Sequence, residues 1–71
     1  MTFKRQAEFV DIVGDHRIPG EPRVENGWAV WDCGHSAPTM AKFVQRAKRR
    51  GFRSAFFRPG RFGVRVEHLE A

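Results

Sequence analysis

Residues 36–51 read SAPTMAKFVQRAKRRG, and this segment carries the signals of an amphipathic helix. Ser36 suits the N-cap, Pro38 suits the first turn, and Gly51 suits the position just after the last turn. From Met40 onward, apolar residues recur at i, i+3, i+4 and i+7, which places them on one side of a helix. The predicted buried stripe consists of Met40, Phe43, Val44 and Ala47.

A β-hairpin is predicted just before this helix. The Asn-Gly pair at 26–27 favours a type I′ turn, because both central residues of that turn have positive φ. It separates residues 22–25 from a second strand over 28–33. Alternation places Trp28 and Val30 on one face of this strand and other apolar residues on the opposite face. A strand with two apolar faces is expected in the centre of a sheet.

A second hairpin is predicted after the helix. Strands are expected over residues 52–58 and 61–69, joined by Pro59-Gly60. Pro followed by Gly favours a type II turn, whose twist suits a two-residue hairpin poorly, so a longer loop is expected. In the last strand, alternation sets Phe62, Val64 and Val66 opposite Gly63, Arg65 and Glu67. In the strand before it, alternation sets Phe52, Ser54 and Phe56 opposite Arg53, Ala55 and Phe57.

The N-terminal segment is ambiguous between strand and helix. Residues 8–13 read EFVDIV and are predicted as a strand, which Gly14 ends. A helix is the alternative, because a different set of apolar side chains fits helical spacing. That set consists of Phe3, Ala7, Val10 and Val13. Residues 14–22 are predicted as a loop, since Pro19, Gly20 and Pro22 interrupt regular structure.

Together these elements predict a single α+β domain over residues 1–71. The expected order is ββ(β)αββ, with an antiparallel sheet of about four or five strands and one helix packed on one face. The other face is expected to be open, and to carry Arg53, Arg65 and one or more aromatic side chains.

Composition limits where the protein is expected to act. Cys33 is the sole cysteine, so no intramolecular disulfide can form and a reducing compartment, the cytoplasm, is expected. No apolar run approaches the roughly 20 residues that cross a bilayer. The segment Met1–Val13 lacks the apolar region of a signal peptide, so neither a membrane span nor a leader is expected.

Positive charge is concentrated in the C-terminal half of the chain. The net charge is +5, but residues 42–66 carry nine cations and no acid, whereas the segments on either side are both net negative. Arginine supplies ten of the thirteen cations, and its planar fork grips phosphate and stacks on aromatic rings. A stretch of this kind favours a polyanionic partner.

The predicted function is non-enzymatic binding of nucleic acid, DNA or RNA, through the basic surface at 42–65. On the helix, four cations are expected to hold phosphates: Lys42, Arg46, Arg49 and Arg50. Four more are expected to line the sheet and its turn: Arg53, Arg58, Arg61 and Arg65. Phe57 is the base-stacking candidate if its face is open.

The alternative is a small inhibitor or adaptor that binds an acidic protein surface, as phage and mobile-element proteins of this size do on host nucleic-acid machinery. Trp28 or Trp31 would anchor such a contact, because exposed Trp and Arg dominate binding energy at interfaces.

Metal binding, cofactor binding and catalysis are not expected. Cys33 and His35 form one short pair of metal-ligating residues, but the remaining candidates, His16, His68, Asp15 and Asp32, supply no second pair at a known zinc spacing. The position of Cys33 just before the predicted helix would favour its thiolate, but His35 is too close in sequence to act as its base, and His16 or His68 would have to fold near it.

Overall fold

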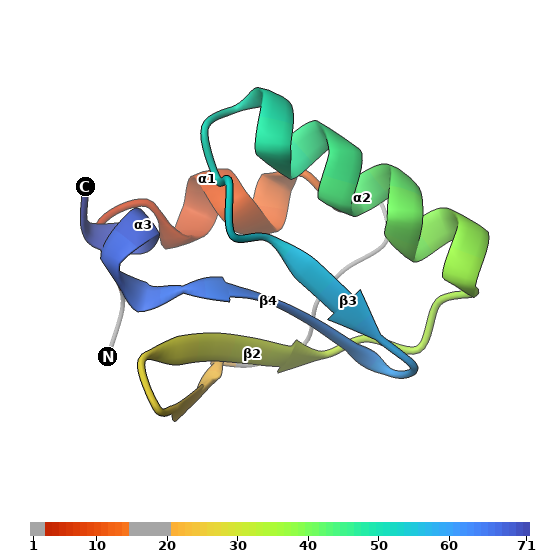
Figure 1. Cartoon of the computed structure of the whole chain (residues 1–71), viewed down its shortest axis with the longest axis horizontal. Helices are drawn as coiled ribbons and strands as arrows, with labels where there is room; N and C mark the ends of the chain where they lie inside the picture. Colours follow the sequence, from red (N-terminus) through yellow and green to blue (C-terminus); the bar gives the residue numbers. More distant parts are fainter. Residues whose placement is uncertain (1–2, 15–20) are drawn as a thin grey trace.

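An antiparallel sheet with helices packed on one face forms the architecture, which confirms the predicted α+β class (Figure 1). The computed structural model describes residues 3–14 and 21–71. In these ranges the elements are α1 (Gln6–Asp11), β1 (Arg23–Glu25), β2 (Trp28–Asp32), α2 (Ala37–Arg49), β3 (Phe56–Arg58), β4 (Arg61–Arg65) and α3 (Val66–Glu70). The four strands lie in the order β1-β2-β4-β3, so the two hairpins pair side by side through β2 and β4.

Helix α2 matches the prediction closely. Ser36 is its N-cap, although the Ser36 hydroxyl bonds the Thr39 hydroxyl at 3.0 Å rather than a backbone N–H. Gly51 follows the helix with a φ of +97°, a left-handed conformation that favours glycine. Within the predicted stripe, Met40, Phe43 and Ala47 are buried, and Val44 packs against the core from its edge.

The first hairpin is also confirmed. Asn26 and Gly27 have φ values of +51° and +84°, which the type I′ turn requires. β2 pairs with β1 on one side and with β4 on the other, so it is central as predicted. Its residues Ala29, Val30 and Trp31 are all at most 5% exposed.

The second hairpin is shorter and tighter than predicted. Arg58 pairs directly with Arg61, so Pro59-Gly60 alone forms the loop and the expectation of a longer one is wrong. Gly60 has a φ of +75°, the positive value that a type II turn needs at its second central residue. Residues 52–55 form turns rather than the predicted strand.

This turn segment reverses the predicted faces of β3. Phe52 is fully buried in the core, yet Phe56 lies on the opposite side of the sheet, across from Gly63. Phe57 pairs with Phe62 and packs against the core instead. The prediction that Phe52 and Phe56 share a face is therefore wrong, because side-chain alternation holds only where the chain is extended.

Residues 6–11 form a helix, so the predicted strand over 8–13 is wrong and the alternative holds. The hydrophobic core explains why a helix forms here, because a helix brings apolar residues from successive turns to one side, where they are buried. Phe9 is fully buried, and its ring stacks on Phe62 at 4.7 Å and on Trp31 at 5.3 Å between centroids. The stripe differs from the one expected: Ile12 is buried and Ala7 is exposed.

The end of the chain also departs from prediction, because the last strand stops at Arg65 and α3 follows. Strand alternation would place Leu69 on the face of Arg65, away from the helices. One helical turn instead brings Val66 and Leu69, three residues apart, to the same side. Leu69 is fully buried, and its carbonyl accepts a 2.7 Å hydrogen bond from the Arg5 N–H, which ties both ends of the chain together.

Most of the predicted loop at 14–22, with Asp15, His16, Pro19 and Gly20, lies outside the described residues. Within the described ranges, no helix has both the length and the apolar character that crossing a membrane requires.

Candidate nucleic-acid interface

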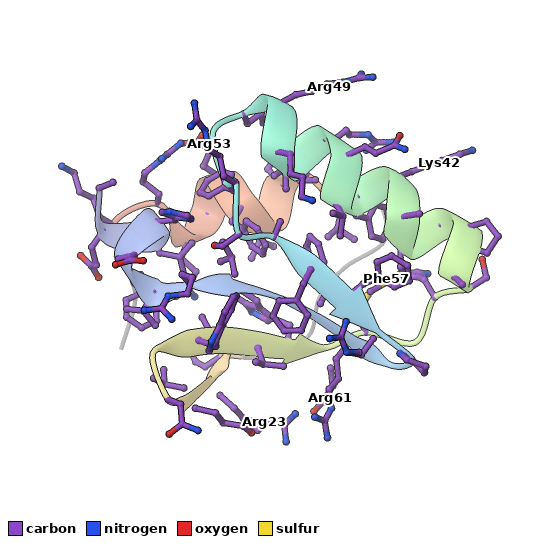
Figure 2. The ribbon with its side chains drawn as sticks, viewed as in Figure 1. Arg23, Lys42, Arg49, Arg53, Phe57 and Arg61 are labelled. Carbon is purple, nitrogen blue, oxygen red and sulfur yellow. The ribbon has the colours of Figure 1, made fainter. Side chains whose placement is uncertain are left out.

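The cations of residues 42–65 divide between two opposite sides of the molecule. Figure 2 shows Lys42, Arg49 and Arg53 on the helix side of the sheet, and Arg61 on the other side. The sequence predicted one continuous basic surface, and the sheet separates it into two. Each side therefore has to be considered as a site of its own.

The helix side carries four exposed cations that make no hydrogen bond or ion pair with any described residue. We call them the α2 surface: Lys42, Lys48, Arg49 and Arg53. Lys42 and Arg49 lie two turns apart, opposite the buried stripe, and Arg53 follows in the turn after the helix. Because no acid occurs between residues 33 and 66, their charge is not neutralised by neighbours in the sequence.

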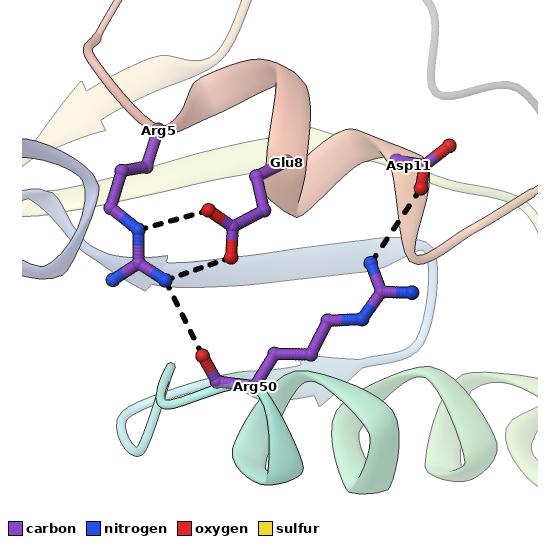
Figure 3. A network of polar contacts seen from close by, with 4 residues as sticks. All are labelled: Arg5, Glu8, Asp11 and Arg50. Carbon is purple, nitrogen blue, oxygen red and sulfur yellow. Dashed lines mark hydrogen bonds and ion pairs between the residues drawn. The ribbon is translucent and has the colours of Figure 1, made fainter.

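Two other predicted phosphate ligands on α2 have structural partners. Arg46 donates a 2.8 Å hydrogen bond to the Ile12 carbonyl at the end of α1. Arg50 lies 3.6 Å from the Asp11 carboxylate (Figure 3). Both contacts hold α1 against α2, so these side chains are less available to an external anion than those of the α2 surface.

Arg5 completes this network from the other helix. It donates two hydrogen bonds to the Glu8 carboxylate and one to the Arg50 carbonyl at the C-terminal end of α2 (Figure 3). A cation at that end complements the helix dipole. The hydrogen bonds from Arg5 hold the pKa of Glu8 below its usual value, and the same pair raises the pKa of Arg5.

The face of the sheet opposite the helices, which we call the open face, carries the remaining cations. The register places Arg61 and Arg65 on this face, and Arg58 beside Arg61. Arg23, which is not among the cations predicted from the sequence, pairs with Val30 and adds a further guanidinium. Arg23 is neutralised by Asp32 at 3.1 Å and Glu25 at 3.7 Å, whereas the Arg61 side chain has no hydrogen bond or ion pair with a described residue.

Arg65 has a structural role on this face. Its guanidinium carbon lies 5.2 Å from the centroid of the Trp28 ring, and its Nε lies 3.3 Å from Glu67. A Cβ at Gly27 would lie 3.6 Å from Arg65 Nη2, an ordinary van der Waals distance, so Gly27 is required by its φ of +84° and not by Arg65. Arg65 therefore fixes Trp28 in place and is not a free phosphate ligand.

Two aromatic rings occupy the centre of the open face. Trp28 and Phe56 meet edge to face at 5.2 Å, and both are half-buried. Gly63 makes this possible, since a Cβ there would approach the Phe56 ring to 2.6 Å. They line a hollow of about 450 Å³, which we call the aromatic hollow, formed by Glu25, Asn26, Trp28, Val30, Phe56, Arg58 and Arg61.

Phe57 and Trp31 do not fit the roles predicted for them. Phe57 lies on the helix side and packs against the core, so the condition for base stacking, an open face, is not met. It borders only a smaller hollow of about 230 Å³ near the start of α2. Trp31 is 1% exposed and cannot anchor a partner, whereas Trp28 remains accessible.

Cys33, the candidate nucleophile, is buried, and His68 is held in a structural contact. Burial raises the pKa of the Cys33 thiol despite the opposing effect of the His35 backbone, so the expected stabilisation of the thiolate is wrong. The Ser54 hydroxyl lies 2.7 Å from His68 Nδ1, but its oxygen also accepts the Arg65 N–H at 3.0 Å. Among the described residues, no three acidic, His or Cys side chains gather as a metal site would require.

Comparison of the chain with protein-family models, curated proteins and solved structures found no match. Function is therefore inferred from the charges, rings and contacts of the described residues.

Proposed function

We propose that this protein is a non-enzymatic nucleic-acid-binding module that contacts backbone phosphates through the α2 surface. One observation carries the proposal: the side chains of Lys42, Lys48, Arg49 and Arg53 are exposed along α2 and the turn after it, and are unpaired among the described residues. Cations that are not neutralised within a protein release the counterions of a polyanion when they bind it, which provides most of the affinity for nucleic acid.

The geometry of α2 favours Lys42 and Arg49 over the other cations of residues 42–65 as phosphate ligands. Lys42 and Arg49 lie about 10 Å apart along α2, since seven residues each rise about 1.5 Å. A regular row of cations on a helix suits a phosphate backbone, whose charges also repeat regularly. Arg46 and Arg50 contribute positive potential nearby, but their guanidinium groups already bind α1.

The test compares two double variants that remove the same charge from opposite sides of the molecule. In the first, Lys42→Gln is combined with Arg49→Gln; in the control, Arg58→Gln is combined with Arg61→Gln. Binding of a labelled DNA duplex is followed by fluorescence anisotropy. We expect the first variant to bind at least about tenfold more weakly, and its salt slope to decrease by about 2, because two phosphate contacts are lost.

The control variant should keep its duplex affinity within about threefold, since it has the same net charge but an intact α2 surface. Equal weakening of both variants would mean that net charge alone drives binding. Failure of the wild-type protein to bind duplex or single strands at low salt would contradict the proposal, and would indicate an acidic protein as the partner.

A further inference from the structure

The aromatic hollow places half-buried aromatic rings beside cations, whereas the α2 surface is defined by cations alone. The Arg61 side chain is exposed and has no hydrogen bond or ion pair with a described residue. Arg58 donates only to the adjacent Phe57 carbonyl, and its guanidinium carbon lies 5.8 Å from the Phe56 ring centroid. Positive charge is therefore available at the rim of a half-buried aromatic floor.

The rings of the hollow are held in position before any ligand arrives. Arg65 lies over Trp28, and the missing side chain of Gly63 lets Phe56 lie across β4. Val30, between β1 and β4 on the same face, is only 5% exposed. A preorganised aromatic surface loses little conformational entropy when a flat group packs on it.

We propose that the aromatic hollow binds one unpaired base of a single-stranded nucleic acid, with Arg58 and Arg61 on the neighbouring phosphates. Base stacking on aromatic side chains beside a positively charged groove is how proteins bind single strands without reading their sequence. The volume of about 450 Å³ lies in the range of small-ligand pockets. At the rim, the Asn26 amide and the Glu25 carboxylate can pair with the polar edge of the base.

This inference rests on the proposed function, because it names the form of nucleic acid that a second surface would take. A base in a duplex has both faces stacked on its neighbours, so a duplex cannot enter the hollow. The two surfaces face opposite directions, so a tetranucleotide is expected to occupy one of them at a time. Mutations in the α2 surface should therefore weaken duplex binding, and mutations in the aromatic hollow should weaken single-strand binding.

The experiment uses intrinsic tryptophan fluorescence of the full chain titrated with the single-stranded tetranucleotide dT4. Trp28 lines the hollow and Trp31 is buried in the core, so Trp28 should supply the response. We expect saturable quenching by dT4, which the Trp28→Phe variant should largely lose. Trp28→Leu should weaken dT4 binding by about tenfold or more in anisotropy, since one stacked base contributes roughly 1–3 kcal/mol.

Charge variants distinguish the two sites. Arg61→Gln removes a side chain with no described partner, so it should fold normally and still weaken dT4 binding several-fold. The combination of Lys42→Gln and Arg49→Gln should leave quenching by dT4 unchanged while it weakens duplex binding. Circular dichroism of each variant serves as the check that it is folded.

No quenching of wild-type protein by dT4, or equal quenching of wild type and Arg61→Gln, would overturn the inference. If duplex binding through the α2 surface persisted in that case, the proposed function would stand and only the aromatic hollow would be excluded. Quenching by a hexaglutamate peptide but not by dT4 would also overturn it, and would assign the hollow to a protein partner.

Discussion

At the residue scale, Gly63 determines what the open face can bind. A Cβ at this position would lie 2.6 Å from the Phe56 ring and 2.7 Å from the Ala29 carbonyl, so no side chain fits. The sequence placed Gly63 correctly on the face of Arg65, and a lone glycine inside a strand often marks such a close approach. The sequence pattern could not identify Phe56 as the group that approaches Gly63, because alternation assigns Phe56 to the other face.

Gly63→Ala should lower the free energy of unfolding by about 1–3 kcal/mol, because the added methyl group must displace a ring or a strand. Gly34→Ala is the matched control, since a Cβ there meets nothing within 4 Å. Urea unfolding measures both variants. Equal midpoints would show that Phe56 does not occupy the space over β4.

Cys33 gives a second prediction at this scale, from the raised pKa of its buried thiol. At neutral pH, iodoacetamide should label Cys33 far more slowly in the folded protein than in urea, because the thiolate is the reactive form. The unfolded chain loses this proton at lower pH than the folded chain does. The free energy of unfolding should therefore fall as the pH rises above about 9, the ordinary thiol value.

Cys33→Ala is the control for this pH dependence, because it removes the titrating group from the same buried site. The free energy of unfolding of the Cys33→Ala variant should vary less with pH above about 9 than that of the wild-type protein. Rapid labelling of the folded wild-type protein would mean that the thiol is accessible or ionised, contrary to its burial.

At the scale of elements, the sequence identified those whose signals are local and missed those that depend on tertiary contacts. The caps and apolar stripe of α2 and the Asn-Gly turn before β2 are short-range signals, and both elements were predicted correctly. Helix α1 was left ambiguous because its buried face is defined by contacts with Trp31 and Phe62, which are distant in sequence.

The irregular segment at 52–55 explains why Phe57 packs against the core and does not lie on the open face. Alternation counted from Phe52 assigns Phe57 to the open face, but the chain is not extended until Phe56. Any irregular residue in between shifts the faces by one, and sequence patterns do not show where that occurs. The residue of β3 that lies on the open face is Phe56, next to the predicted Phe57.

The contact between Arg46 on α2 and the end of α1 gives a testable prediction at the scale of elements. Arg46→Met keeps most of the side chain but removes the 2.8 Å hydrogen bond to the Ile12 carbonyl, so the free energy of unfolding should fall by about 1 kcal/mol. Arg49→Met is the control, since Arg49 has no partner among the described residues. Thermal unfolding compares them, and an identical Tm for both would argue against a structural role for Arg46.

At the scale of the whole molecule, the charge asymmetry of the sequence becomes a division between two faces. Composition identified residues 42–66 as the basic region of the chain. It could not reveal that α2 and the β3–β4 hairpin present these cations on opposite sides of a sheet (Figure 2). Nor could it separate free cations from those that bind α1 or Trp28, because these contacts join distant segments.

The central claim is that the α2 surface binds nucleic-acid phosphates, and the salt dependence of duplex binding by the wild-type protein tests it most directly. If all four cations of that surface contact phosphates, the logarithm of the association constant should fall linearly with the logarithm of salt concentration, with a slope of about −3 to −4. A slope near zero, or no binding at low salt, would contradict the claim.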